Sequence, residues 1–308
     1  MSVLNILFVG SDEVARSIAK KSDSRDVDNY IYKDLKEGGL FSTISILRPN
    51  NYPDKPKPFF TSLTVSDFGI IEVNKVDGSF GEVIVSMASA GIKDGLVLIN
   101  PSEGEWVDDS QVKTLLKQAG LSNWEFIEND GVLIREKLIE VLNQIKPNDD
   151  DGFVVAVDQA FTVKGVGLVA IGHVQSGKVN KHDELLLAGS EGNAIARSLQ
   201  VMDLDVDVAN VGDRVGLAMR TAGPFREDLL GKGSILADSN ERFAVESNSK
   251  FELNKAAFQK NDLVAGDVVH LCSDLQFVVG RISEISDCVH INWDFPIVLN
   301  KSSKRNPL

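Results

Sequence analysis

The chain has 308 residues, of which 43% are hydrophobic and 25% charged, so it can bury ordinary cores in two or three domains and is not a disordered polypeptide. It contains no apolar run long enough to cross a membrane, and its start lacks the basic region of a signal peptide, so we expect a cytoplasmic protein without a membrane partner. The net charge of -13 argues against a protein that coats nucleic acid electrostatically, and no DNA partner is expected.

Strand and helix patterns alternate along the first part of the chain. Residues 4–9 form a continuous apolar run, typical of a strand buried on both faces, and residues 12–21 have helical spacing. Only a short polar stretch separates this helix from the next strand. Further strands are expected at residues 41–47, 68–73, 95–100 and 124–128, with helices at 81–91, 108–120 and 131–146. This alternation predicts parallel crossovers and a doubly wound α/β domain over residues 1–148.

The first strand-to-helix turn is where such a sheet would hold a phosphate. A phosphate-binding loop reads G-x-x-x-x-G-K-[ST]: its glycines let backbone amides converge, and its lysine balances the phosphate charge. Gly10 and Ser17 match this pattern, but Ala15 replaces the second glycine and Arg16 the lysine, and two acidic residues lie inside the loop. We interpret these four positions as a vestigial nucleotide loop. The simpler alternative, a tight turn followed by a helical serine, is favoured.

Six strand-like runs follow a segment at residues 147–151, PNDDD, which we expect to be a hinge. Every gap between the runs carries Gly, Asp or Asn, and none is long enough for a helix. The runs can therefore hide their apolar faces only by closing on one another, which predicts a small β-barrel over residues 151–240. The runs are residues 154–161, 168–174, 183–189, 193–201, 214–222 and 234–238.

Residues 241–308 carry further strand patterns, at 243–253, 267–272, 276–285, 288–293 and 295–299. Two of these runs contain a histidine two positions from a cysteine, His270 with Cys272 and His290 with Cys288. A four-ligand zinc site would require both strands to meet face to face, so we expect no metal.

The order of several segments resembles the second domain of the translational GTPases, in particular the elongation factor Tu and SelB branch. The matching segments are VDQAFTVKGVG, GHVQSGKVNKHDEL, ARSLQVMDLDV, GDRVGLAM and EDLLGKGSILAD, in that order between residues 157 and 238. The resemblance implies a GTPase-like α/β domain followed by two small β-barrels, the second being a shortened third domain at 241–308.

The resemblance also implies nucleotide motifs that the first domain lacks. The family's Asp-x-x-Gly falls on residues 48–51, which read Arg-Pro-Asn-Asn, and its guanine-reading Asn-Lys-x-Asp falls on Asn100 to Glu103, which read Asn-Pro-Ser-Glu. A second Asn-Lys-x-Asp at residues 74–77 follows the wrong strand and suits a turn. The proline-rich stretch at 48–58 is expected to be a rigid connector over the damaged site. We therefore expect no GTP hydrolysis and no cofactor, with GTP and Mg²⁺ binding as the alternative.

In the family the barrel domain holds the aminoacylated end of tRNA along one edge. Carried over by residue, Gln200 stands where the family has a glutamate against the terminal adenosine, and Asp203 where it has an arginine. The neighbouring Met202 is on the same edge, and His173, Gln175 and Ser176 occupy the matching rim, in a segment interpreted as a turn. The alternative to RNA binding is that His173 has a structural role and that Asp203 belongs to a solvated acidic face.

Two functions in different classes follow from these residues and the resemblance. The first is an elongation-factor-like adaptor that does not hydrolyse GTP and binds tRNA, the ribosome or another translation factor. The second is a specialised GTP-binding elongation factor that delivers a particular aminoacyl-tRNA.

Overall fold

The computed structural model describes residues 2–35, 41–145 and 152–301. The expected hinge at 147–151 lies outside these ranges. The chain divides into two compact units, residues 1–146 with 254–262 (unit 1) and residues 147–253 with 263–308 (unit 2). The second and third expected domains therefore belong to one compact unit, although each has its own sheet, and the boundary between them stays a prediction.

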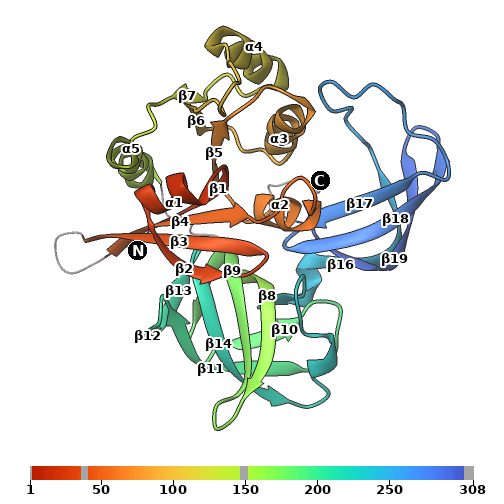
Figure 1. Cartoon of the computed structure of the whole chain (residues 1–308). Helices are drawn as coiled ribbons and strands as arrows, with labels where there is room; N and C mark the ends of the chain where they lie inside the picture. The colour runs from red at the N-terminus through yellow and green to blue at the C-terminus, as the bar shows by residue number, and fades with distance from the viewer. Residues whose placement is uncertain (1, 36–40, 146–151, 302–308) are drawn as a thin grey trace. The chain divides into compact units, whose positions relative to one another are not determined.

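Unit 1 is built on a seven-stranded sheet with the order β2-β3-β4-β1-β5-β6-β7 (Figure 1). The strands β1, β4, β5, β6 and β7 run parallel, whereas β2 and β3 are antiparallel additions at one edge. The central strands are apolar on both faces, as expected for a sheet covered by helices on both sides. The strands are β1 (Val3–Val9), β2 (Lys20–Ser24), β3 (Val27–Leu35), β4 (Phe41–Pro49), β5 (Phe68–Val73), β6 (Gly95–Ile99) and β7 (Glu125–Phe126).

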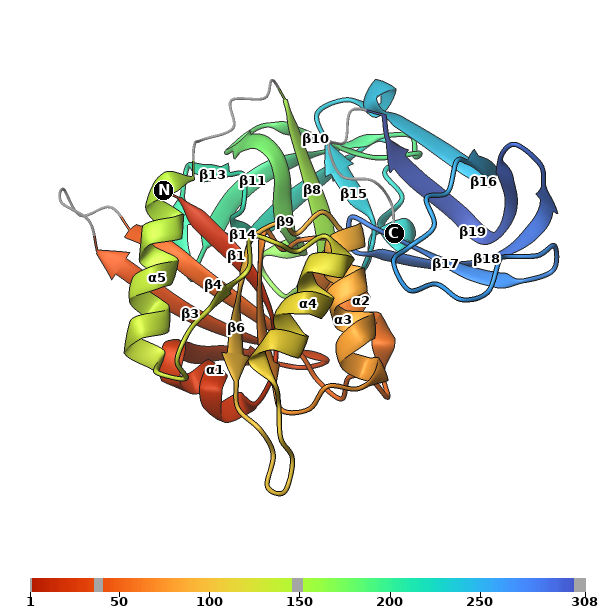
Figure 2. The same cartoon turned by 90° about the horizontal axis from the view of Figure 1, so that it is seen from above.

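Within the described part of unit 1, five helices cover this sheet. Figure 2 shows α1 and α5 on one side of it and α2 and α3 on the other. Aspartate side chains accept hydrogen bonds from the first backbone amides of α3, α4 and α5, which fixes where these helices begin. The helices are α1 (Asp12–Ile18), α2 (Pro56–Leu63), α3 (Gly78–Ser89), α4 (Asp109–Ala119) and α5 (Gly131–Gln144). No helix in the described ranges has the length and hydropathy needed to cross a bilayer.

One expectation for unit 1 was wrong. The short polar stretch after the first helix forms β2 and β3, and the helix itself ends at Ile18. The proline-rich stretch at 48–58 runs from the end of β4 into the first turn of α2, where the missing N–H of Pro56 and Pro58 removes no helical hydrogen bond. That this stretch is a rigid connector stays a prediction.

The first sheet of unit 2 contains all six predicted runs. Its strands pair in the order β10-β15-β8-β9-β14-β11, and β11 pairs back with β10, so the pairing forms a ring. Two short strands, β12 (Leu204–Val206) and β13 (Val208–Asn210), were not predicted. The ring strands are β8 (Phe153–Val163), β9 (Gly167–Asn180), β10 (Glu184–Leu187), β11 (Asn193–Val201), β14 (Arg214–Ala222) and β15 (Ile235–Ala237).

The second sheet of unit 2 has four antiparallel strands in the order β16-β19-β18-β17. They are β16 (Phe243–Phe251), β17 (Val268–Ser273), β18 (Gln276–Ile285) and β19 (Val289–Asn300), and two of the predicted runs merge into β19. Trp293 packs in its core, and its indole N–H donates to Ser249 Oγ at 3.0 Å. That this sheet closes into a barrel stays a prediction.

Candidate functional site

The turn between β1 and α1 is where the sequence predicts a vestigial nucleotide loop. Only Gly10 and Ser11 lie between the strand and the helix, because Ser11 caps α1 by accepting the amide of Val14 at 3.3 Å. The other three candidates are therefore helical. Ala15 is buried in the core, and the Ser17 hydroxyl donates to the carbonyl of Val14 at 2.7 Å. Arg16 is exposed and pairs with Asp12, one helical turn earlier.

A buried carboxylate contacts this turn from β5. Glu72 is 5% exposed, and its Oε2 accepts the backbone amide of Ser11 at 2.5 Å. A Cβ at Gly10 would lie 2.7 Å from Glu72 Oε2 and 2.6 Å from the ring of Phe8, so the close approach of Glu72 requires glycine here. The amide that a phosphate-binding loop would offer to its ligand is thus bound to an anion that belongs to the protein.

Asn100, the first residue of the altered guanine motif, reaches the same carboxylate. Its Nδ2 donates to Glu72 Oε1 at 2.6 Å, and its own carbonyl accepts from Asn74 Nδ2 at 2.7 Å. The structure therefore brings Gly10 and Asn100 together through Glu72, as the doubly wound fold predicts. Glu103 lies three residues further on, exposed in a turn.

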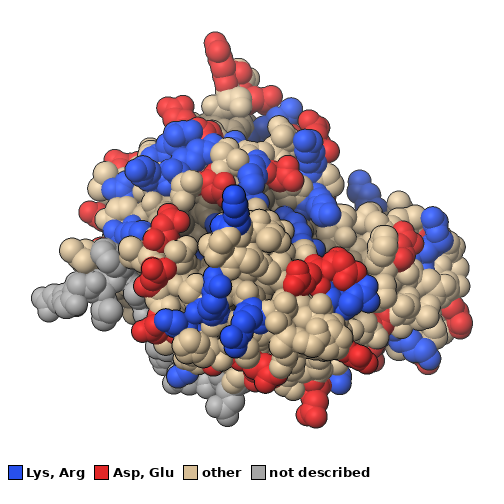
Figure 3. Space-filling view, turned by 90° about the horizontal axis from the view of Figure 1, so that it is seen from below, with Lys and Arg blue, Asp and Glu red and all other residues tan. Residues whose placement is uncertain are grey.

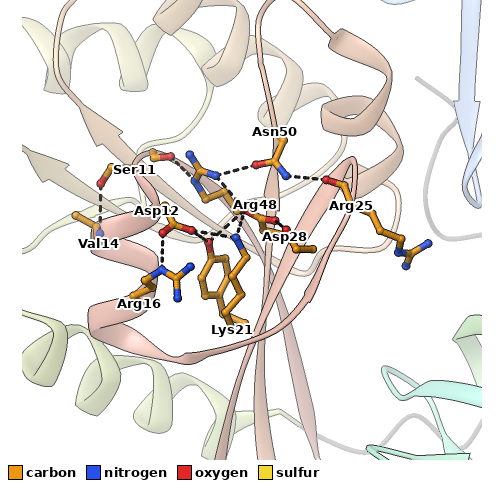
Figure 4. A network of polar contacts seen from close by, with 12 residues as sticks. Ser11, Asp12, Val14, Arg16, Lys21, Arg25, Asp28, Arg48 and Asn50 are labelled. Carbon is orange, nitrogen blue, oxygen red and sulfur yellow. Dashed lines mark hydrogen bonds and ion pairs between the residues drawn. The ribbon is translucent and has the colours of Figure 1, made fainter.

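Arg48, near the end of β4, contacts the turn between β1 and α1 (Figure 4). Its Nε donates to the carbonyl of Gly10 at 2.7 Å, and its Nη1 contacts Asn50 Oδ1 at 2.9 Å and Asp28 Oδ2 at 3.3 Å. This residue stands where the family resemblance places the aspartate of the Mg²⁺-linked motif. In place of a carboxylate near Mg²⁺, the structure has the Arg48 cation, which binds the loop carbonyl of Gly10 and the Asp28 carboxylate on β3.

The same network extends over β2 and β3 through two aspartates (Figure 4). The Asp12 Oδ1 accepts from the hydroxyl of Tyr30 at 2.5 Å and from Lys21 at 3.2 Å, and the Tyr30 and Arg16 hydrogen bonds hold the Asp12 pKa well below its usual range. Asp28 is 3% exposed. Burial raises its pKa, but hydrogen bonds from Lys21, Ser24 and Asn50 outweigh this and lower it. Both aspartates are therefore ionised and neutralised within the protein.

The barrel candidates are not one exposed rim. The segment expected to be a turn at 172–177 lies inside the continuous strand β9, and His173 is 4% exposed with no partner for its Nδ1. The expectation that His173 lies on an exposed rim is therefore wrong, because its side chain is buried. Gln175 and Ser176 are half-buried, and the Ser176 hydroxyl oxygen is buried without a partner.

Three candidates at the end of β11 lie close together in one hairpin. Gln200 is exposed, and its Nε2 donates to Asp205 Oδ1 on β12 at 3.0 Å. Met202 and Asp203 form the two-residue turn, with φ of 53° and 63°, the geometry that a tight β-hairpin needs. Met202 also packs against the barrel core. Whether this hairpin binds RNA stays a prediction.

Sequence reasoning missed Glu72, Asp28 and Tyr30. Glu72 carried a signal, since a single carboxylate in the otherwise apolar strand FGIIEV must find hydrogen-bond donors when that strand is buried. Asp28 and Tyr30 lie in a strand that was not predicted, so no pattern connected them with Asp12.

The fold of the chain is similar to that of translation elongation factors of the SelB type. The chain is 30% identical to the uncharacterized protein MJ0325 of Methanocaldococcus jannaschii over 281 residues, which is 91% of this chain and 86% of that protein. It is 32% identical over 216 residues to the selenocysteine-specific elongation factor of Escherichia coli, covering 65% of this chain. No family model matches.

Solved structures show the same fold at low sequence identity. The elongation factor SelB of Methanococcus maripaludis, in complex with the GTP analogue GppNHp, superposes with a TM-score of 0.77 over 97% of this chain and 73% of its own, at 18% identity. The chain belongs to the family of MJ0325, and its fold is similar to the folds of the solved SelB and EF-Sec structures. It spans only 34% of the length of the E. coli factor.

Proposed function

We propose that the protein is an elongation-factor-like adaptor that does not hydrolyse GTP and binds tRNA, the ribosome or another translation factor through its β-sheet domains. The contact between Glu72 and the Ser11 amide carries the proposal. A nucleotide phosphate at this amide would have to displace a buried carboxylate or lie beside it, and two anions a few ångströms apart repel each other strongly in a buried setting.

Other contacts support the same conclusion. A carbonyl at Gly10, a hydroxyl at Ser17 and a carboxylate at Asp12 all have hydrogen-bond partners within the protein. A ligand site usually contains polar groups that lack hydrogen-bond partners until the ligand binds. These three groups already have hydrogen-bond partners within the protein. Arg48 also takes the place of the family's Mg²⁺-linked aspartate, so the charge at that point has the wrong sign for a metal.

The alternative is a specialised GTP-binding elongation factor. It is favoured by one observation, the similarity of fold to a SelB that is described in complex with a GTP analogue. In that case Glu72 and Arg48 would have to move away from the turn when nucleotide binds.

Nucleotide assays separate the two functions. We expect the purified chain to release no phosphate from GTP above buffer, and excess GTP or GDP with Mg²⁺ to leave the melting temperature unchanged, because a ligand raises apparent stability only if it binds the native state. Ser17→Ala is the control, since its hydroxyl is used inside α1. Phosphate release that Ser17→Ala abolishes, or a reproducible rise of several degrees with nucleotide, would establish the alternative.

The hairpin between β11 and β12 is the proposed contact for tRNA. We expect Gln200→Ala with Met202→Ala to weaken tRNA binding by the full chain, because the side chains that could stack and donate there are lost. The salt dependence of binding should be shallow, since residues 151–240 have only four lysines and four arginines.

A filter-binding titration at several salt concentrations measures both effects. The control is Glu191→Ala, an exposed residue beyond the opposite end of β11. Because Met202 packs against the barrel core, the melting temperature of the double variant must be recorded as well. Unchanged tRNA affinity in a folded double variant, or a steep salt dependence, would exclude the hairpin.

A further inference from the structure

A loop between β6 and α4, residues 100–108, projects from unit 1 and presents an exposed tryptophan. Trp106 is 80% exposed, whereas the other two tryptophans of the chain, Trp124 and Trp293, are 6% and 8% exposed. Figure 2 shows the loop extending away from the sheet and helices of its unit. Tryptophan is a largely buried residue type on average, so an almost fully exposed one on an ordered loop is a candidate contact residue.

The loop is held in place at both ends. At its start, the amide of Ser102 donates to the carbonyl of Asn74 at 3.2 Å, and Lys75 lies 3.6 Å from Glu105 Oε1. At its end, Val107 is buried, and Asp108 caps α4 by accepting the amide of Ser110 at 2.9 Å. Trp106 thus lies on a segment that is held in place at both ends, which reduces the conformational entropy that the loop would lose on binding a partner.

The negative charge of the residues around Trp106 indicates which kind of partner the loop would bind. The sequence from residue 102 to 109, SEGEWVDD, has four carboxylates and no basic residue, and the projection at the top of Figure 3 ends in acidic side chains. An RNA backbone would be repelled here. An arginine or lysine side chain would instead find the tryptophan ring for cation–π stacking, with carboxylates beside it.

We propose that the loop at residues 100–108 is a docking site for a basic protein segment, with Trp106 as its anchor. The proposal does not depend on the state of the nucleotide site. The loop follows β6, at the position where the GTPases that this chain resembles carry their guanine-reading motif. In this chain the first residue of the altered motif, Asn100, donates a hydrogen bond to Glu72. The rest of the loop is therefore available for contact with a protein partner.

A short arginine-only peptide tests the proposal with the full chain. Binding is followed by the anisotropy of a labelled peptide and by the emission of Trp106, the one strongly exposed tryptophan among the three. We expect Trp106→Ala to weaken binding about tenfold, the order of a hot-spot contact, and Trp106→Phe to retain part of the affinity. Phe295→Ala, which removes a 72% exposed aromatic side chain from β19, is the matched control and should leave the affinity unchanged.

The charge contribution is measured separately. Glu103→Gln with Glu105→Gln should weaken binding and reduce its salt dependence while Trp106 stays exposed. A glutamate-only peptide and tRNA should leave the Trp106 emission unchanged. The proposal is overturned if Trp106→Ala binds the arginine peptide as well as the parent chain does, since the peptide would then be held by the net charge of the protein alone, or if tRNA shifts the Trp106 emission.

Discussion

Replacing Asp28 by alanine should lower the free energy of unfolding of unit 1 by about 3 to 5 kcal/mol, the cost of removing one partner from a buried ion pair. The Asp28 side chain is 4% exposed and lies 2.7 Å from the Lys21 ammonium and 3.3 Å from Arg48. Without Asp28, Arg48 loses the one ion pair it has in the described ranges, and Lys21 keeps the longer ion pair with Asp12 and its contact with the Tyr30 ring. The Ser24 hydroxyl would lose its acceptor as well.

Two variants show whether the charge of Asp28 causes the effect. Asp28→Asn keeps the shape and an acceptor oxygen, so it should destabilise unit 1 less than alanine does. Asp23→Ala removes a carboxylate that pairs with Arg25 on the surface of the same β2–β3 hairpin, and should change little, because exposed pairs contribute little. Chemical denaturation followed by circular dichroism measures all three. Equal, small effects for Asp28 and Asp23 would mean that the network does not stabilise the unit.

The elements that the sequence predicted correctly are those with a regular hydrophobic pattern. The six runs of the first unit 2 sheet were found because their apolar residues alternate and glycine or aspartate separates them. The parallel core of unit 1 was found because its strands are apolar on both faces. The edge strand β2, KKSDS, was missed because its side chains are largely solvated, so no hydrophobic pattern marks it.

The sequence predicted where the candidate site lies in the fold, but it did not predict which side chains contact one another there. Gly10, Arg48 and Asn100 were singled out as altered motif residues, and the structure connects them through Glu72 and the loop backbone. Which carboxylate would reach Ser11 depends on the register between β1 and β5, where Phe8 pairs with Ile70 and Val9 with Ile71. Such long-range pairing cannot be read from local spacing, and the same limitation explains the misplaced His173.

The stability of unit 2 should fall as the pH is lowered from about 6.5 to about 4, because His173 is buried in its neutral form. Burial lowers the pKa of His173 to about 4, with the nearby cation of Arg214 adding to the effect, Asp158 opposing it and Lys232 contributing least. In this pH range the unfolded chain binds a proton that the folded chain does not, so acid favours unfolding. The pKa difference corresponds to a loss of about 3 kcal/mol once the pH is below both values.

His173→Leu should remove this part of the pH dependence. Leucine has a similar size, and it also removes the buried Nδ1 that has no hydrogen-bond partner, so the variant should equal or exceed the parent in stability at neutral pH and exceed it more clearly at pH 5. His182→Asn is the control, because His182 is exposed in a turn with φ of 75°, which asparagine tolerates. Thermal unfolding between pH 4 and 8 measures all three chains. If the curves of the parent and of His173→Leu run parallel across this range, then the pKa of His173 is the same in the folded and the unfolded chain, and burial of its neutral ring does not cause the acid sensitivity.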